Sequence, residues 1–332
     1  MSSEPFTCFL VDKDEDGKIR SGITRRPMAA LPEEDVLIRV QWSSLNYKDA
    51  LAATGQPGVA KKLPHVPGLD AAGTVVECHD GNFKPGQEVI VTGYDLGAGQ
   101  WSGWADYVVV PAEWVIPLPA GLTLETAMHY GTAGFTAAMS VQAIVDHGLE
   151  PAGGKIVVTG ATGGVGCVAV MLLAKLGYQV TAVTGKESLH AQLKDLGATE
   201  VVGRGDILDD SARPLLSARW AGAVDCVGGE MLTSLLRATD LRGCVTCCGL
   251  VAGPKLNMTV FPFILRGVTL AGIDSGWYPR PLRLKLWEKL GDAWRLENLA
   301  EMTQTVALAD VESWVQKILR GEVTGRTLVA VG

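Results

Sequence analysis

Four closely spaced glycines are the residues of this chain best suited to binding a ligand. They are Gly160, Gly163, Gly164 and Gly166, with Val165 among them. The apolar run 156–159 before them predicts a buried strand, and the apolar residues of 168–176 have helical spacing. Such a turn lets the backbone approach a pyrophosphate while N–H groups at the helix start face the phosphates. The pattern indicates a dinucleotide site, the alternative being a glycine-rich turn that binds nothing.

The end of the next predicted strand, 179–183, distinguishes NAD from NADP. An NAD site usually has an acidic residue here for the ribose 2′-hydroxyl, whereas NADP needs room and positive charge for the 2′-phosphate. This strand is followed, in order, by Thr184, Gly185 and Lys186. Glu187 comes one step later, where we expect it to face solvent, and Arg204 follows the third predicted strand. The sequence therefore predicts NADPH as the cofactor, with NADH as the alternative.

The elements around this turn predict an α/β fold with two parts. Further strands are expected at 224–227, 244–250 and 268–274, which gives a Rossmann doubly wound parallel sheet. The first 110 or so residues instead contain short strands separated by Pro and Gly, and such spacing predicts a small β-barrel. These strands are expected at 6–11, 36–43, 71–78, 88–92 and 104–110, with a hairpin turn at 12–17.

Composition excludes several function classes. The net charge of −7 argues against nucleic-acid binding. The first residues lack the features of a signal peptide, and no apolar run reaches the ~20 residues of a membrane span. The seven cysteines are scattered, so we expect reduced thiols in a cytoplasmic protein. Cys244, Cys247 and Cys248 fall in one predicted strand, where packing as small apolar side chains explains them better than metal binding.

Several motifs resemble the medium-chain dehydrogenase/reductase superfamily over essentially the whole chain. They are NYKDAL (46–51), PHVPGLDAAGTV (64–75), CGLVAG (248–253), LRGVTLAGIDS (265–275), WYPRPLRLKLWEKL (277–290) and GRTLVAVG (325–332). The resemblance is closest to the acrylyl-CoA reductase group of the quinone oxidoreductase-like branch. It implies a GroES-like β-barrel catalytic domain of 1–127 and 277–332, and a Rossmann domain of 128–276. It also implies a homodimer that pairs the edge strand 268–273.

The zinc ligands of the alcohol dehydrogenases in this superfamily are replaced here. Those enzymes have Cys at the position of Asn46 and Gly-His-Glu at the position of Gly68-Leu69-Asp70. The lobe with four cysteines for a structural zinc is also missing, and the five histidines lack ligand spacing. We therefore expect no metal.

Without a metal, the resemblance implies reduction of a C=C bond conjugated to a carbonyl group. The expected reaction is NADPH-dependent reduction of an α,β-unsaturated thioester, acrylyl-CoA to propionyl-CoA, with hydride transfer to the β-carbon. Such a reaction needs orientation of the reactants and stabilisation of the developing negative charge. A quinone oxidoreductase and a non-catalytic NADPH-binding protein are the alternatives.

The resemblance also assigns roles to single residues. Tyr47 lies against the nicotinamide in related enzymes, where its phenol can hydrogen-bond an enolate oxygen or relay a proton, or only line the pocket while solvent supplies the proton. Asn46 is expected to hold the ribose or the substrate through its amide. Asp70 and Arg326 form an expected buried pair near the cofactor, with Arg326 alternatively touching phosphate. Further cofactor contacts are expected at Leu250, Ile264 and Ser275.

Four basic residues are candidates for binding the adenosine 3′-phosphate of coenzyme A. They are Lys61, Lys62, Arg280 and Arg283. An ordinary solvated surface explains them equally well.

Overall fold

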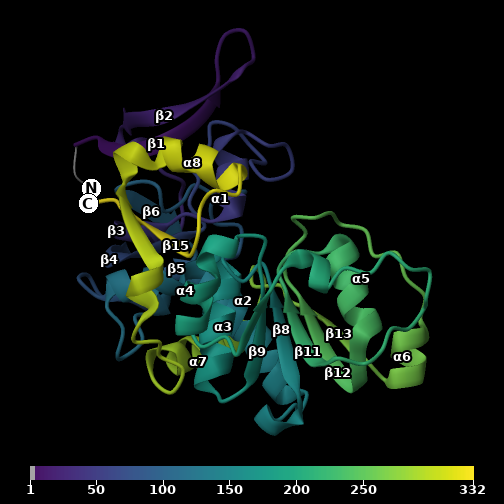
Figure 1. Cartoon of the computed structure of the whole chain (residues 1–332). Coiled ribbons are helices and arrows are strands. Elements are labelled where there is room, and N and C mark those ends of the chain that lie inside the picture. Colours follow the sequence, from purple (N-terminus) through teal and green to yellow (C-terminus); the bar gives the residue numbers. More distant parts are fainter. Residues whose placement is uncertain (1–3) are drawn as a thin grey trace. The chain divides into compact units, whose positions relative to one another are not determined.

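The computed structural model describes residues 4–332 and divides into two compact units (Figure 1). The first unit comprises the chain up to Thr132 and from Ser275 onward, and the second unit is Ala133–Asp274. The expected Rossmann segment, 128–276, begins a few residues before the second unit and ends just after it. The difference arises because helix α2 (Leu124–Asp146) crosses the division.

The first unit is built on an open seven-stranded sheet. Its main path runs β14-β15-β3-β4-β5-β7, with β6 paired to β3, and β1 and β2 form a separate antiparallel hairpin. The strands are β1 (Phe6–Lys13), β2 (Ile19–Arg26), β3 (Val36–Ser44), β4 (Asp70–Cys78), β5 (Glu88–Thr92), β6 (Tyr107–Val110), β7 (Ile116–Pro117), β14 (Thr303–Ala307) and β15 (Arg326–Ala330). The helices besides α2 are α1 (Tyr47–Ala53), α7 (Arg280–Gly291) and α8 (Val311–Leu319).

Apolar alternation explains why the first unit folds this way. Val36, Ile38 and Val40 of β3 are buried in the same core cluster, as expected for side chains on one face of a strand. In a second core cluster of this unit, Val311 and Val315 of α8 are buried together with residues of β1 (Figure 1). The last strand, β15, pairs with β3, and the C-terminal segment thereby completes the sheet that begins near the N-terminus.

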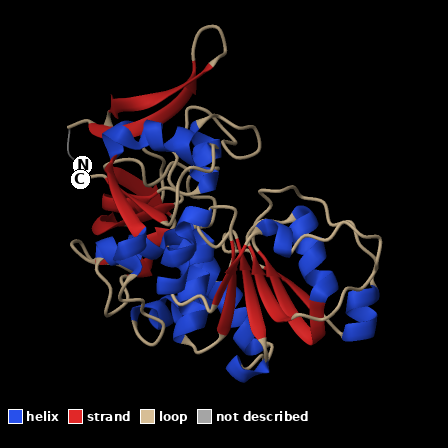
Figure 2. Cartoon of the chain, viewed as in Figure 1, coloured by secondary structure: helices blue, strands red, loops and turns tan. Residues whose placement is uncertain are grey.

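The second unit is a six-stranded, wholly parallel sheet with helices on both faces (Figure 2). The order is β10-β9-β8-β11-β12-β13, which confirms the predicted doubly wound fold. The strands are β8 (Lys155–Thr159), β9 (Gln179–Val183), β10 (Glu200–Val202), β11 (Trp220–Asp225), β12 (Thr239–Cys247) and β13 (Thr269–Gly272). The helices are α3 (Gly164–Lys175), α4 (His190–Asp195), α5 (Gly229–Ala238) and α6 (Phe261–Arg266).

Several predicted strand ends were wrong, each for a local reason. β11 ends at Asp225 rather than at residue 227, because the Asp225 carboxylate accepts from the Gly228 N–H at 2.7 Å and turns the chain. β12 ends at Cys247 rather than at residue 250, where the chain begins the loop that faces this turn. β6 begins at Tyr107 rather than at residue 104, since the Trp104 N–H donates to the Pro67 carbonyl instead of a strand partner.

Helix α2 contains one residue outside helical geometry. Gly131 has φ 49° and ψ −155°, a conformation that favours glycine. A Cβ here would also lie 2.6 Å from Asp70 Oδ2 and 2.9 Å from Arg326 Nη2. The kink therefore lets the helix backbone approach a buried polar cluster. Within residues 4–332, no helix is long and apolar enough to cross a membrane.

Candidate functional site

The glycine turn links β8 to α3 in the second unit. Gly163 is the N-cap of α3, and Gly166 lies one turn on, where a Cβ would collide with the Gly160 carbonyl oxygen. The first N–H groups of a helix have no carbonyl partner within it, and the helix dipole is positive at this end. No acidic residue lies in the first turn of α3. The turn thus has the geometry and charge that a pyrophosphate requires.

A cavity of about 480 Å³ lies at the ends of β9 and β10. Its lining residues are Thr184, Gly185, Glu187, His190, Val201, Val202, Gly203, Arg204 and Asp206. The guanidinium of Arg204 lies over Gly185, since a Cβ on this glycine would be 3.1 Å from Arg204 Nε. Burial, together with the positive charge of Arg204, lowers the pKa of Lys186. The structure therefore brings together Thr184, Gly185, Lys186 and Arg204, as a phosphate site requires.

Two carboxylates line this cavity together with Arg204. Glu187 is the first residue of a 3₁₀ turn, Glu187–Leu189, and it is exposed as predicted, but it also lines the cavity. The Asp206 carboxylate accepts from the Gly203 N–H at 2.8 Å, which ties it to the cavity wall. The negative charge of Glu187 opposes a phosphate, so the sequence-based expectation that it simply faces solvent was incomplete.

The other two expected cofactor contacts of the second unit lie apart from this cavity. Leu250, in the loop after β12, and Ile264, on α6, are exposed, and neither is among the lining residues. Ser275 belongs to the first unit, where its carbonyl accepts from Arg283 Nη2 at 2.7 Å. Their assignment to the cofactor remains a prediction.

A buried hydrogen-bond network centred on Asn46 dominates the candidate site of the first unit. Asn46 Nδ2 donates to Asp70 Oδ2 at 2.8 Å, to Asp49 Oδ2 at 3.1 Å and to Ser44 Oγ at 3.1 Å. Asn46 Oδ1 accepts from Arg326 Nη1 at 3.2 Å. A side-chain amide has only two N–H hydrogens, so three acceptors already exceed its supply.

This arrangement changes the role expected for Asn46. From the sequence, its amide was expected to hold the ribose or the substrate. In the structure the side chain is buried, and its nitrogen and oxygen both bind protein groups. Asn46 is therefore better described as a positioning residue than as a catalytic one.

Asp49 holds two segments of chain together. Its Oδ2 accepts from the Asn46 backbone N–H at 2.7 Å, and its Oδ1 accepts from the Leu69 N–H at 2.7 Å. Burial, with the nearby charge of Asp70 adding to it, raises the pKa of Asp49 to about 7. This carboxyl group fixes the start of α1 against the segment that leads into β4.

Asn46 also connects Asp70 to Arg326. Asp70 accepts from Ser44 Oγ, from the Thr132 N–H at 2.8 Å and from Thr132 Oγ1 at 2.6 Å. Arg326 donates from Nε to the His129 carbonyl at 2.9 Å and from Nη1 to Asn46. The expected neighbourhood of Asp70 and Arg326 is present, and the Asn46 side chain bridges the two.

Tyr47 stands at the edge of this network with its ring accessible. It is the first residue of α1, directly after Asn46, and 45% of it is exposed. Since Asn46 and Asp49 fix the first turn of the helix, they also fix the position from which the Tyr47 ring projects. An ordered backbone with an accessible phenol is what a hydrogen-bond donor to substrate requires.

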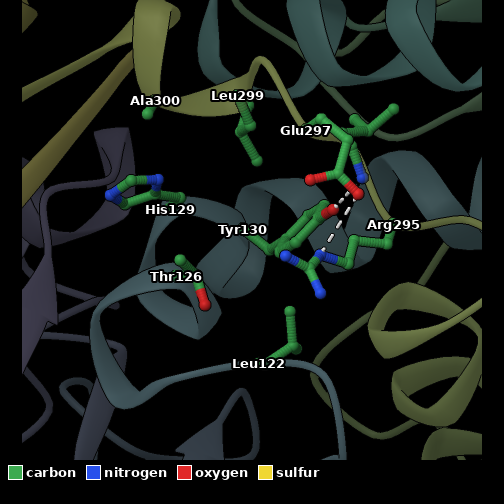
Figure 3. Close-up of a pocket in the computed structure, with 9 residues that line it drawn as sticks. Leu122, Thr126, His129, Tyr130, Arg295, Glu297, Leu299 and Ala300 are labelled. Atoms are coloured by element: carbon green, nitrogen blue, oxygen red, sulfur yellow. Dashed lines mark hydrogen bonds and ion pairs between the residues drawn. The ribbon is translucent and has the colours of Figure 1, made fainter.

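A second cavity, of about 60 Å³, lies in the first unit (Figure 3). It is lined by His129 and Tyr130 of α2 and by the 295–300 segment, where Arg295 and Glu297 are ion-paired at 3.5 Å. Burial lowers the pKa of His129 and raises the pKa of Tyr130 to about 12, so both are neutral at pH 7. Substrate pockets are typically about 300 Å³ or larger, so this cavity holds neither thioester nor dinucleotide.

The candidate basic residues for coenzyme A have structural partners instead. Arg283 is fully buried, with Nη1 2.9 Å from the Thr92 carbonyl, and its guanidinium lies over the Tyr94 ring. Arg280 Nη1 donates to the Val115 carbonyl at 2.7 Å, and Lys61 pairs with Asp95 at 2.7 Å. Arg283 is therefore excluded as a ligand for a phosphate. Among the four candidate residues for coenzyme A, Lys62 is the one to which these contacts give no structural partner.

Two features of the site were missed from the sequence. Asp49 was given no role at the site from the sequence, although the spacing of NYKD, with an acid three residues after the N-cap, resembles a capping box. Thr132 donates two hydrogen bonds to Asp70, and no sequence signal identifies this contact. In the described part of the chain, no three His, Cys, Asp or Glu side chains are grouped to hold a metal ion.

Comparisons with known families match both parts of the chain. Residues 32–120 match the alcohol dehydrogenase GroES-like domain, and residues 164–290 match the zinc-binding dehydrogenase family. Among curated proteins, acrylyl-CoA reductase AcuI of Ruegeria pomeroyi is 44% identical, over 98% of this chain and 99% of that protein. The putative quinone oxidoreductase YhfP of Bacillus subtilis is 44% identical, over 90% of this chain and 91% of that protein.

Solved structures give the same grouping. The YhdH oxidoreductase of Salmonella enterica in complex with NADP has a TM-score of 0.95 and 43% identity, with 98% of this chain and 100% of that chain covered. Bacillus subtilis YhfP with NAD bound has a TM-score of 0.95 and 41% identity, with 99% and 100% covered.

Proposed function

Since this chain belongs to the medium-chain dehydrogenase/reductase superfamily, in the group that includes AcuI and YhfP, we propose that it is an NADPH-dependent acrylyl-CoA reductase. The reaction adds hydride to the β-carbon of the α,β-unsaturated thioester and a proton to the α-carbon, which gives propionyl-CoA. The observation that carries this proposal is the 44% identity to an acrylyl-CoA reductase over 98% of the chain. That similarity spans both the glycine turn and the Asn46 network.

The second unit supplies the cofactor site. Bound NADPH provides the hydride, as in other nicotinamide enzymes. The N–H groups at the start of α3 hold the pyrophosphate, and Lys186 with Arg204 binds the 2′-phosphate. The proximity of Lys186 to Arg204 supports this assignment, because a 2′-phosphate requires positive charge around it.

Tyr47 is the catalytic residue that we propose in the first unit. Its phenol donates a hydrogen bond to the thioester oxygen, where negative charge develops as the enolate forms. The buried network below it keeps α1 in one position, so the donor is preorganised. Asn46 acts on the reaction through this positioning, and Arg326 extends the network from β15 to α1.

A quinone is the second candidate substrate. A quinone also accepts hydride without needing a metal, and the similarity to YhfP favours this alternative. The bound NAD in the YhfP structure makes NADH the alternative cofactor. The assay below distinguishes the two substrates, and the same assay repeated with NADH distinguishes the two cofactors.

The test of the function is NADPH oxidation by the purified full-length chain, with acrylyl-CoA in one cuvette and benzoquinone in another. We expect saturable oxidation with the thioester and formation of propionyl-CoA. A higher kcat/KM with benzoquinone than with acrylyl-CoA would show that the substrate is a quinone and not a thioester. If NADPH binds but neither substrate is turned over, the protein is a non-catalytic NADPH-binding protein.

The proposal includes a homodimer in the cytoplasm. Strand β13 is one of the two edge strands of the six-stranded sheet, and Leu241, Ile264 and Leu265 are exposed in the same unit. An edge strand tends to be covered by a partner, and a second copy pairs it in this proposal. All seven cysteines are free thiols, which is usual in a reducing compartment. Light scattering coupled to size exclusion measures the mass, and a monomer at micromolar concentration would contradict the dimer.

A further inference from the structure

Two thiols lie side by side at the carboxyl edge of the parallel sheet. Cys226 and Cys248 are the residues directly after β11 and β12, and their Sγ atoms are 3.8 Å apart. The strands are paired with Asp225 opposite Cys247, so the next residue on each strand brings the two thiols together. Packing explains Cys244, which is fully buried within β12, and Cys247, which packs against the core of this unit, but Cys248 lies beyond the end of β12 and is only partly buried.

The spacing of these two residues suits a disulfide. Neighbouring strands lie about 4.8 Å apart, within the range of about 4.4–6.8 Å that Cα atoms of a disulfide adopt. The Sγ atoms must approach to about 2.05 Å, a closure of less than 2 Å from their present separation. The Cys248 thiol also donates to the Asp225 carbonyl at 3.3 Å, which keeps it on the side of Cys226.

The pair lies next to the glycine turn. The Cys226 N–H donates to Thr159 Oγ1 at 3.0 Å, at the end of β8. A Cβ on Gly160 would lie 3.5 Å from the Cys226 Cβ, so this cysteine packs against the first glycine of the turn. The loops after β11 and β12 are also in close contact, since a Cβ on Gly228 would lie 2.9 Å from the Gly249 carbonyl oxygen. Movement of either cysteine must therefore displace its surroundings at the edge where dinucleotides bind.

We propose that Cys226 and Cys248 form an oxidation site at which a peroxide converts the two thiols to a disulfide and thereby weakens dinucleotide binding. The Cys248 sulfur attacks one peroxide oxygen, the O–O bond breaks, and a sulfenic acid and one water form. The Cys226 sulfur then displaces the hydroxyl group of the sulfenic acid, which forms the S–S bond and releases a second water. The two sulfurs together lose two electrons and two protons, and the peroxide gains them.

The protonation of Cys226 affects the second of these steps. The hydrogen bond from Cys248 and burial raise the pKa of the Cys226 thiol well above its usual value, and Asp225 and Cys167 add to the effect. Burial, with the charge of Asp225 adding to it, also raises the pKa of Cys247 beside the pair. Because a thiolate attacks sulfur far faster than a thiol does, the step in which Cys226 closes the disulfide accelerates as the pH rises.

Peptide mapping tests the linkage. The oxidised full-length protein is alkylated, digested with trypsin and compared with a sample reduced by dithiothreitol. Cleavage after Arg219, Arg237, Arg242 and Lys255 places Cys226 in peptide 220–237 and Cys248 in peptide 243–255. We expect these peptides to be joined in the oxidised sample alone, and fragmentation to identify Cys248 as the linked residue. Alkylation of both cysteines after prolonged peroxide treatment would overturn the proposal.

Titration with NADPH tests the consequence. We expect the dissociation constant of the oxidised wild-type protein to rise about tenfold, a coupling of ordinary size between sites, and to return to its original value after reduction. In Cys226→Ser and in Cys248→Ser, we expect oxidation to leave the dissociation constant unchanged. Cys247→Ser alters the neighbouring half-buried thiol and should still show the rise. A dissociation constant that stays constant while the peptides are linked would overturn the proposal. Because the readout is NADPH binding, the result stands even if acrylyl-CoA is not the substrate.

Discussion

Asp49 and Asp70 accept hydrogen bonds from the same nitrogen atom, Nδ2 of Asn46, at 3.1 Å and 2.8 Å. Both carboxyl groups are fully buried. Burial disfavours ionisation of Asp49, and the nearby charge of Asp70 disfavours it further. The site of the first unit is thus a pair of buried acids stabilised by one amide, with the Arg326 guanidinium bound to the oxygen of that amide.

The first prediction concerns pH and stability. The pKa of Asp49 is raised to about 7 by burial and then by the charge of Asp70, whereas an unfolded Asp has a pKa of about 3.9. Between these two values the folded state holds a proton that the unfolded state has lost. The free energy of unfolding contributed by Asp49 therefore falls as the pH rises through this window.

Denaturant unfolding at several pH values from about 4 to about 8 measures this slope. Asp49→Asn cannot titrate, so we expect its free energy of unfolding to decline less steeply than that of the wild type. Asp240→Asn, at an exposed position, is the matched control and should retain the wild-type slope. Parallel curves for the wild type and Asp49→Asn would show that Asp49 does not titrate in this range.

The second prediction concerns the bridge made by Asn46. Asn46→Ala removes the donor to Asp49 and Asp70 and the acceptor for Arg326, so buried polar groups lose partners. We expect a loss of about 3 kcal/mol in the free energy of unfolding. Asn257→Ala, at an exposed loop position, should change the stability by less than about 0.5 kcal/mol. Equal stabilities for the two variants would show that the network contributes nothing to the fold.

The third prediction concerns cofactor choice. Arg204→Ala removes a cation from the cavity at the ends of β9 and β10. We expect the dissociation constant for NADPH to rise about thirtyfold, from the loss of a charge-assisted hydrogen bond, with little change for NADH. Glu187→Gln removes an opposing charge from the same cavity and should tighten NADPH binding. If Arg204→Ala weakened NADH and NADPH binding equally, Arg204 would not contact the 2′-phosphate.

The fourth prediction concerns Tyr47. Tyr47→Phe removes the phenol and keeps the ring, so kcat with acrylyl-CoA should fall about a hundredfold, as expected for loss of a positioned donor. The dissociation constant for NADPH should remain nearly unchanged. Tyr107→Phe, in β6 of the same unit, is the control and should retain full turnover. If Tyr47→Phe kept the wild-type kcat, the phenol would not be needed, and solvent would protonate the enolate.

Much of the fold follows from local patterns in the sequence. The bounds of β9 and β5 match the predicted runs, because each is a short apolar stretch between turn residues. The ends of β11 and β12 could not be predicted, because they depend on bonds such as that from the Gly228 N–H to Asp225. Tertiary contacts of this kind leave no periodic signal in the chain.

The candidate site was predictable only in part, for a similar reason. The glycine turn and the cations at 186 and 204 belong to motifs whose spacing has a physical meaning. The burial of Arg283 and the saturation of the Asn46 amide depend instead on residues far away in sequence, Thr92 and Arg326 respectively. Charge and residue type alone therefore indicated ligand contacts where the structure shows internal ones.

Isotope transfer tests the central claim most directly. The protein is given acrylyl-CoA with NADPH deuterated at C4 of the nicotinamide, in light water and separately with unlabelled NADPH in heavy water. Hydride transfer to the β-carbon predicts that the cofactor deuterium appears at the β-carbon of propionyl-CoA and the solvent deuterium at the α-carbon. Cofactor deuterium at the α-carbon, or its absence from the product, would contradict the proposed reaction.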